Sequence, residues 1–154
     1  MRTDEDGMMK TSLDQVALDD LLEEAKKAAE NSYSPYSGFK VGAALRLNNG
    51  KVVTGTNVEN VSYGLTICAE RAALVRAVSE FGSCIRIEAV AVANLNGAAS
   101  PPCGACRQML AEFAEHGAPV VFPAADGTRT MSFEQILPLG FDMKLKNTGT
   151  GDRE

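Results

Sequence analysis

Hydrophobic and polar residues are arranged along this chain with two periods, and these periods predict its helices and strands. Apolar residues recur at helical spacing over residues 12–30, 67–81 and 103–115, which predicts an amphipathic helix in each range. Between these ranges, shorter stretches alternate or run together as strands do. The predicted strands cover residues 39–47, 51–58, 85–93, 120–123 and 128–131, and a short helix over 132–138 follows them.

The order of these elements predicts a fold of the α/β class. Helices on both faces of a mixed five-stranded sheet make a three-layer α/β/α sandwich. Asn49-Gly50 is a hairpin turn, so the first two strands should be antiparallel. The third and fourth strands are joined through a helix and should be parallel, with a right-handed crossover. The stretch 39–47 alternates like a strand with one buried face, whereas 85–93 ends as a strand covered on both faces does.

Local signals mark where the helices begin. Ser12 with Gln15 has the form of a capping box before the first helix, and Ser132 with Gln135 repeats it before the last one. Thr66 is the predicted N-cap of the second helix. These signals place the helix starts within the periodic stretches.

Composition and charge narrow the classes of function. The chain has 154 residues, of which 45% are apolar and 23% charged, and one domain over residues 12–143 accounts for it. Residues 1–11 are expected to be a disordered extension, and residues 144–154 a solvated tail. The net charge of −5 disfavours a nucleic-acid partner, because phosphates need a basic surface. There is no apolar run of about 18 residues and no signal-peptide core, so we expect a cytoplasmic protein without a membrane partner.

Three of the four cysteines have the spacing of metal ligands. Cys68 lies at the start of one predicted helix. Cys103 and Cys106 are three positions apart on the first turn of another, so they point to one side. Zinc binds thiolates in a tetrahedron, and a catalytic zinc site keeps one position open. Three cysteines leave that position open, and Glu70 is a candidate for handling protons beside it.

A nearby cation should support such a site. The positive end of each helix dipole favours the thiolate form of a cysteine. Three thiolates and one Zn²⁺ sum to a formal charge of −1, which weakens the metal as a Lewis acid. Arg71 is the obvious group to offset this charge by donating hydrogen bonds to the sulfurs, and Arg107 or Gln108 are further candidates.

Spacing alone leaves other interpretations of these residues open. A lone C-x-x-C also occurs in redox sites and in buried packing. Cys84 lies outside the pattern, and we expect it to be a small buried residue. His116, the only histidine, follows a predicted helix end, where capping or solvent contact is expected rather than catalysis.

Longer motifs carry a resemblance to a known family. Cys-x-Glu followed by Pro-Cys-x-x-Cys is the signature of zinc nucleobase deaminases. The chain resembles the homotetrameric cytidine deaminases over about residues 15–141, and the segment after that range departs from the family's usual ending. The resemblance rests on Phe39-Lys-Val-Gly-Ala-Ala, on Asn57-Val-Glu59-Asn-Val-Ser-Tyr63-Gly-Leu-Thr-Ile-Cys-Ala-Glu-Arg71 and on Pro102-Cys-Gly-Ala-Cys-Arg-Gln108.

The resemblance implies a cytidine deaminase-like fold and a zinc enzyme. It implies that Cys68, Cys103 and Cys106 ligate one Zn²⁺ per subunit, with Glu70 as the proton shuttle. The implied reaction is hydrolytic deamination of cytidine and deoxycytidine to uridine and deoxyuridine, with release of ammonia, as in pyrimidine salvage.

The resemblance also implies how a nucleoside is bound. Asn57 and Glu59 would hydrogen-bond the ribose, and Phe39 would pack against the pyrimidine. Asn57 and Glu59 are alternate residues at a strand end, so both can point the same way, and their oxygens suit sugar hydroxyls. From the residues alone, a polar pair facing water is an alternative for Asn57 and Glu59, and periodicity alone puts Phe39 in the core.

A homotetramer with active sites near subunit interfaces is the assembly that the resemblance implies. The two cysteine-bearing helices are rich in alanine and larger apolar residues. The sheet can cover only one face of each helix, so the composition favours burial of a second face against another subunit. We hypothesise that Phe141 reaches the pocket of a neighbouring subunit, although packing within its own subunit suits the sequence equally well.

Three alternatives to this function remain open. A related zinc deaminase acting on another small substrate, such as an aminopyrimidine antibiotic, would keep the cysteines and Glu70 without needing Asn57 or Glu59. A polynucleotide-editing deaminase would need a basic surface, which the charge disfavours. A binding module with structural zinc would normally have four protein ligands, and the pattern supplies three.

Overall fold

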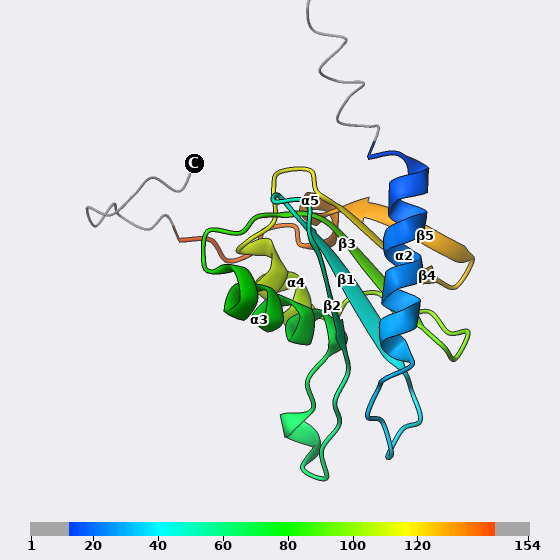
Figure 1. Cartoon of the computed structure of the whole chain (residues 1–154). Coiled ribbons are helices and arrows are strands. Elements are labelled where there is room, and N and C mark those ends of the chain that lie inside the picture. The colour runs from blue at the N-terminus through cyan, green and yellow to red at the C-terminus, as the bar shows by residue number, and fades with distance from the viewer. Residues whose placement is uncertain (1–12, 144–154) are drawn as a thin grey trace, which may run out of the picture.

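A computed structural model describes residues 13–143, in which helices cover a five-stranded sheet (Figure 1). The predicted extension 1–11, residue 12 and the predicted tail 144–154 lie outside this range. Within it, no helix is both long and apolar enough to cross a membrane. In chain order the elements are α2 (Gln15–Ala29), β1 (Val41–Leu47), β2 (Val52–Thr56), the 3₁₀ helix η1 (Tyr63–Leu65), α3 (Ala69–Phe81), β3 (Ile87–Asn94), α4 (Gly104–Ala111), β4 (Pro119–Ala124), β5 (Gly127–Ser132) and α5 (Phe133–Ile136).

The sheet has the strand order β2-β1-β3-β4-β5 and mixes both orientations. β1 is antiparallel to β2 and to β3, β3 is parallel to β4, and β4 is antiparallel to β5. The predicted hairpin, the predicted parallel pair and the mixed five-stranded sheet are therefore confirmed.

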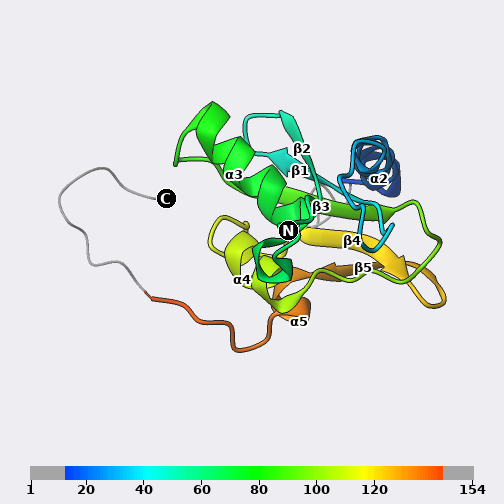
Figure 2. The ribbon, with the colours of Figure 1, turned by 90° about the horizontal axis from the view of Figure 1, so that it is seen from below.

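Helices cover both faces of the sheet, as Figure 2 shows, with α2 on one side and α3 and α4 on the other. α2 packs over β1 and β3, and α3 packs over β2 and β1. The prediction that the first strand has a single buried face is wrong. Residues 42–45 are all buried, because α2 covers one face of β1 and α3 covers the other.

Two predicted helix starts are also wrong. α2 begins with Asp14, not Ser12, as its N-cap, and the Asp14 carboxylate accepts a hydrogen bond of 3.1 Å from the Ala17 N–H. α3 begins after Cys68 and not after Thr66, because Ile67 is still held in an extended pair with Val58. The predicted capping box of the last helix is confirmed, with both of its hydrogen bonds present.

α4 ends at Ala111, short of the predicted end at residue 115. The residues that follow turn back to the sheet. The Phe113 carbonyl accepts a hydrogen bond from the Ile87 N–H, and the Glu115 N–H donates to the Ile87 carbonyl, at 2.8 and 2.9 Å. Pairing with the start of β3 thus replaces the last predicted turn of the helix.

Two glycines let helices lie directly on strands. A Cβ atom at Gly55 of β2 would lie 2.6 Å from the Ala69 carbonyl oxygen at the start of α3. A Cβ atom at Gly42 of β1 would lie 2.6 Å from the Ala29 nitrogen at the end of α2. Contacts this short do not occur with a real side chain, so the close approach of α3 to the sheet requires glycine at position 55.

We therefore predict that Gly55→Ala destabilises the protein by about 1–3 kcal/mol, because it forces the helix away from the strand. Denaturant unfolding measures this change. Gly64→Ala is the matched control, since a Cβ atom there meets nothing within 4 Å. Equal stability of the two variants would contradict the close packing of α3 on β2.

Candidate metal centre and active site

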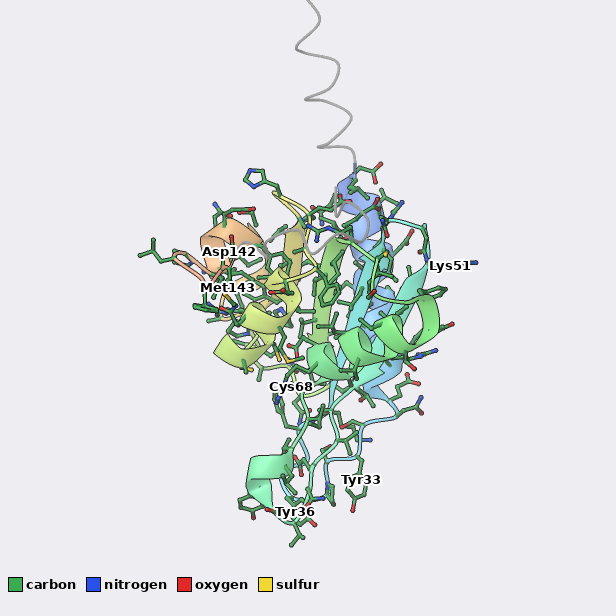
Figure 3. The ribbon with its side chains drawn as sticks, turned by 90° about the vertical axis from the view of Figure 1, so that its left-hand side faces the viewer. Tyr33, Tyr36, Lys51, Cys68, Asp142 and Met143 are labelled. Atoms are coloured by element: carbon green, nitrogen blue, oxygen red, sulfur yellow. The ribbon has the colours of Figure 1, made fainter. Side chains whose placement is uncertain are left out.

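The N-termini of α3 and α4 bring three cysteines together. Cys68 is the N-cap of α3, Cys103 is the N-cap of α4, and Cys106 lies in the first turn of α4. The Cys68 and Cys103 sulfurs are 3.8 Å apart, and the Cys103 and Cys106 sulfurs are 3.4 Å apart. Figure 3 shows Cys68 between the helical layer and the projecting loops that carry Tyr33 and Tyr36. The three predicted ligands thus form one cluster.

This cluster fits zinc. All three sulfurs lie within 4.8 Å of one another, and each cysteine is free rather than disulfide-bonded. Thiolates at about 2.3 Å from a tetrahedral zinc would be about 3.8 Å apart, so the observed spacing needs only small shifts. A set of soft sulfur donors suits Zn²⁺. Cys68, Cys103 and Cys106 are the residues that would hold the ion.

Arg71 lies beside the sulfur cluster, one helical turn after Cys68. Its Nη2 atom donates to the Cys68 sulfur at 3.6 Å and to the Thr66 carbonyl at 3.3 Å. The pKa of the Cys68 thiol falls to about 5 because Cys106 and Arg71 donate hydrogen bonds to its sulfur. The pKa of the Cys106 thiol is raised, because its proton is held toward Cys68 and the side chain is buried. Of these two thiols, Cys68 therefore loses its proton more readily than Cys106.

Glu70 points into the same cluster from the first turn of α3. Glu70 is 5% exposed, and its Oε2 atom lies 3.4 Å from the Cys106 sulfur. Burial raises the pKa of the Glu70 carboxyl, and the negative charge of Cys68 adds to the rise. A buried carboxyl with a raised pKa, next to a metal-binding cluster, can both accept and release a proton.

Two further predicted supports of the metal site have other partners. Gln108 exchanges two hydrogen bonds with the backbone of Phe141: its Nε2 atom donates to the carbonyl at 2.9 Å, and its Oε1 atom accepts from the N–H at 3.2 Å. Arg107 donates to the carbonyls of Pro102 and Ile136, at 2.7 and 2.8 Å. Gln108 thus fixes the segment at Phe141, whose side chain is 76% exposed.

Asn57 and Glu59 are buried, which contradicts the alternative that they face water. The Asn57 Oδ1 atom accepts hydrogen bonds from the Ser32 hydroxyl and the Val41 N–H, and its Nδ2 atom donates to the Phe39 carbonyl at 2.8 Å. These bonds tie the end of β2 to the segment that leads into β1.

The Glu59 carboxylate binds the loop that precedes this segment. It accepts hydrogen bonds from the Ser37 hydroxyl and from the N–H groups of Tyr36 and Ser37. The Ser37 hydroxyl and these two N–H groups hold the pKa of Glu59 below its usual value. Glu59 therefore stays ionised and fixes the loop around its charge.

Glu59 lines a cavity of about 310 Å³. Its wall is completed by Tyr36, Ser37, Tyr63 and Thr66. The rings of Tyr36 and Tyr63 meet edge to face, with centroids 5.9 Å apart. The sequence interpretation gave these four residues no role in binding, because they come from two segments without periodicity and meet only in the fold.

The structure also places Phe39, Cys84 and His116. Phe39 is half-buried and not a core residue, and its N–H donates to the Ser37 hydroxyl at 3.0 Å. Cys84 was expected to be buried and is exposed, because it lies in the turn after α3. His116 is 94% exposed and pairs with the Glu134 carboxylate at 3.0 Å, in agreement with the expected solvent contact.

Comparison with known proteins places the chain in a family. Residues 16–122 match the family model described as the cytidine and deoxycytidylate deaminase zinc-binding region. A cytidine deaminase of Halalkalibacterium halodurans is 43% identical over 128 residues, which are 82% of this chain and 96% of that protein. One of Sporosarcina psychrophila is 48% identical over 122 residues, covering 79% and 88% of the two chains.

Solved structures agree with these matches. The crystal structure of a cytidine deaminase from Burkholderia pseudomallei superposes with a TM-score of 0.71 at 45% identity, over 80% of this chain and 98% of that one. The crystal structure of the enzyme from Mycobacterium tuberculosis gives a TM-score of 0.69 at 40% identity, over 81% and 97%. With its three clustered cysteines and its buried glutamate, the chain belongs to the cytidine deaminase family.

Proposed function

We propose that this protein deaminates cytidine and deoxycytidine by hydrolysis, giving uridine and deoxyuridine and releasing ammonia, as a step of pyrimidine salvage. The observation that carries the proposal is the buried Glu70 carboxyl beside the three cysteine sulfurs. The relatives named as cytidine deaminases support the choice of substrate.

In this proposal Cys68, Cys103 and Cys106 hold one Zn²⁺ per subunit. When bound, zinc supplies a Lewis acid that lowers the pKa of a water molecule toward about 7. Arg71 donates to the Cys68 sulfur and so offsets part of the thiolate charge that would weaken this effect.

Glu70 moves the protons of the reaction. It takes a proton from the attacking water and delivers it to N3 of the pyrimidine while the oxygen adds to C4. It then takes the proton of the added hydroxyl and passes it to the amine at C4, which leaves as ammonia while the C4 carbonyl forms. One carboxyl acts first as a base and then as an acid, and the raised pKa of Glu70 suits both steps.

Asn57, Glu59 and Phe39 bind the nucleoside in this proposal. Glu59 lines the cavity and offers carboxylate oxygens to the ribose hydroxyls. The Asn57 Nδ2 atom donates one N–H to the Phe39 carbonyl, and its second N–H can donate to a sugar oxygen. Phe39, held at the end of the same segment, packs against the pyrimidine.

The net charge supports a small substrate over a polynucleotide. A chain with a net charge of −5 repels a phosphate backbone, so the editing of DNA or RNA is disfavoured. The direct test is to incubate the protein with cytidine, deoxycytidine, cytosine and CMP and to follow the loss of absorbance. Turnover of the two nucleosides is expected, and turnover of another aminopyrimidine alone would contradict the proposal.

We also propose that the protein is a cytoplasmic homotetramer with Phe141 entering the site of a neighbouring subunit. Large apolar side chains are exposed on the loop around η1, on α3 and α4, and on the final described segment. Among them are Val61, Tyr63, Leu65, Val75, Met109, Leu139 and Phe141. Exposed apolar groups in such number favour burial against other subunits.

Glu70→Gln tests the proton shuttle. The substitution keeps the size of the side chain and removes its capacity to carry a proton. We expect unchanged zinc content and a fall in kcat of about 100-fold or more. Zinc analysis and steady-state kinetics measure both quantities, and a smaller loss with full zinc content would reject Glu70 as the shuttle.

Cys103→Ala tests the ligand set, with Cys84→Ala as the matched control because Cys84 is an exposed thiol outside the cluster. We expect Cys103→Ala to lose most of its zinc and to melt at a lower temperature, since metal binding and folding are coupled. Cys84→Ala should match the wild type in both measurements. A fully zinc-loaded and stable Cys103→Ala protein would show that Cys103 is not a ligand.

Mixing two inactive variants tests the subunit contact. Light scattering should first give a mass near four chains, and a monomer at micromolar concentration would contradict the assembly. Phe141→Ala and Glu70→Gln subunits are then unfolded, mixed and refolded together. Some mixed tetramers hold an intact Glu70 site covered by a partner's intact Phe141, so activity should exceed the sum of the separate variants. Strictly additive activity would place Phe141 in its own subunit.

A further inference from the structure

The short segment before β1 exposes backbone groups on both of its edges. Gly38 has a positive φ of 68° and turns the chain out of the loop, and residues 39–41 lead from it into β1. The backbone groups of residues 38–41 bond alternately to partners on opposite sides. One edge carries the Gly38 carbonyl and the Lys40 N–H, and the other carries the Phe39 carbonyl and the Val41 N–H. β2 and β3 lie beside this segment, but within the described residues their backbones do not bond these four groups, so side chains must satisfy them.

Two asparagine side chains bond these four backbone groups in the way that neighbouring strands would. On one edge the Asn57 carboxamide accepts from the Val41 N–H at 3.0 Å and donates to the Phe39 carbonyl at 2.8 Å. On the opposite edge the Asn96 carboxamide accepts from the Lys40 N–H at 3.0 Å and donates to the Gly38 carbonyl at 3.1 Å. Each carboxamide thus imitates a peptide group of a paired strand.

We infer that Asn96 is a positioning residue for Phe39, and that it acts on binding of the substrate base by clamping the backbone on both sides of that ring. This inference rests on the proposed function, in which Phe39 packs against the pyrimidine. The two bonds of Asn96 straddle Phe39 itself, whereas those of Asn57 straddle Lys40. Asn96 lies outside every motif that suggested the function, in the loop between β3 and α4.

Hydrogen bonds of the loop between β3 and α4 fix the position of Asn96. The Asn94 Oδ1 atom accepts hydrogen bonds from the Asn96 N–H at 3.0 Å and from the Ala98 N–H at 3.3 Å. The Leu95 N–H donates to the Lys40 carbonyl at 3.1 Å, which continues the β1–β3 pairing by one residue. The Asn96 carboxamide is therefore placed against the segment by its own backbone.

The clamp also connects the base-binding and sugar-binding groups. The Ser37 hydroxyl accepts from the Phe39 N–H and donates to Glu59. A shift of the backbone at Phe39 would therefore move the ring and disturb the loop around Glu59. Because Asn96 is exposed, water can replace its bonds, so its loss should affect substrate binding more than folding.

Asn96→Leu is the test, since leucine has a similar shape and makes neither bond. We expect the KM for cytidine to rise about three- to tenfold with kcat within about twofold, as for two net hydrogen bonds lost at a binding site. The same substitution in a Phe39→Leu background should add nothing to the KM. Asn96→Asp keeps the acceptor for the Lys40 N–H but turns an oxygen toward the Gly38 carbonyl, so the KM of this variant should also rise. If Asn96→Leu fails to fold, Asn96→Asp takes its place in the test.

Asn48→Leu is the matched control. Asn48 lies at the other end of the β1–β3 pair and accepts a hydrogen bond of 3.1 Å from the Arg86 N–H. Its loss should leave the KM unchanged. An unchanged KM in Asn96→Leu, or an equal rise in KM with and without Phe39, would overturn the inference.

Amide hydrogen exchange separates this inference from the proposed function. In zinc-loaded Asn96→Leu the Lys40 amide should exchange faster than in the wild type, while the Val41 amide, held by Asn57, should change less. An unchanged Lys40 amide would reject the clamp whatever the activity. Inactivity of the wild type on cytosine nucleosides would contradict the proposed function instead, and the exchange result would then decide the clamp alone.

Discussion

The convergence of two helix N-termini on one group of sulfurs is the constraint on which the site depends. Both α3 and α4 point the positive ends of their dipoles at Cys68, Cys103 and Cys106, which favours the thiolates that a metal needs. This geometry requires α3 to lie close to the sheet, which the glycine at position 55 allows. Without a cation between them, three thiolates would repel one another, so metal binding and the meeting of the two helices should stabilise each other.

Hydrogen bonds from outside the helices build the rest of the site. Glu59 accepts hydrogen bonds from the backbone N–H groups of Tyr36 and Ser37, and Asn57 bonds the segment that carries Phe39. Arg71 contacts both the Cys68 sulfur and the carbonyl of Thr66 in the cavity wall. Arg71 therefore connects the metal cluster to the cavity wall, and a change in the position of either one should move the other.

The sequence predicts those parts of the molecule that depend on local pattern. Periodicity and turn residues identify the hairpin at Asn49-Gly50 and the parallel pair of β3 and β4, because each is determined by neighbouring residues. Cysteine spacing identifies the cluster, because the two helix starts provide its geometry. The same reasoning fails where tertiary contacts decide. α4 stops early because Phe113 and Glu115 pair with Ile87, and Gln108 binds the Phe141 backbone across 33 positions of sequence.

The central claim is that three cysteines bind one zinc ion and leave a position open for chemistry. X-ray absorption at the zinc edge of the purified protein tests this claim most directly. The account predicts three sulfur neighbours at about 2.3 Å and one oxygen or nitrogen neighbour at about 2.0 Å. Four sulfur neighbours, or a protein that binds no zinc, would contradict it.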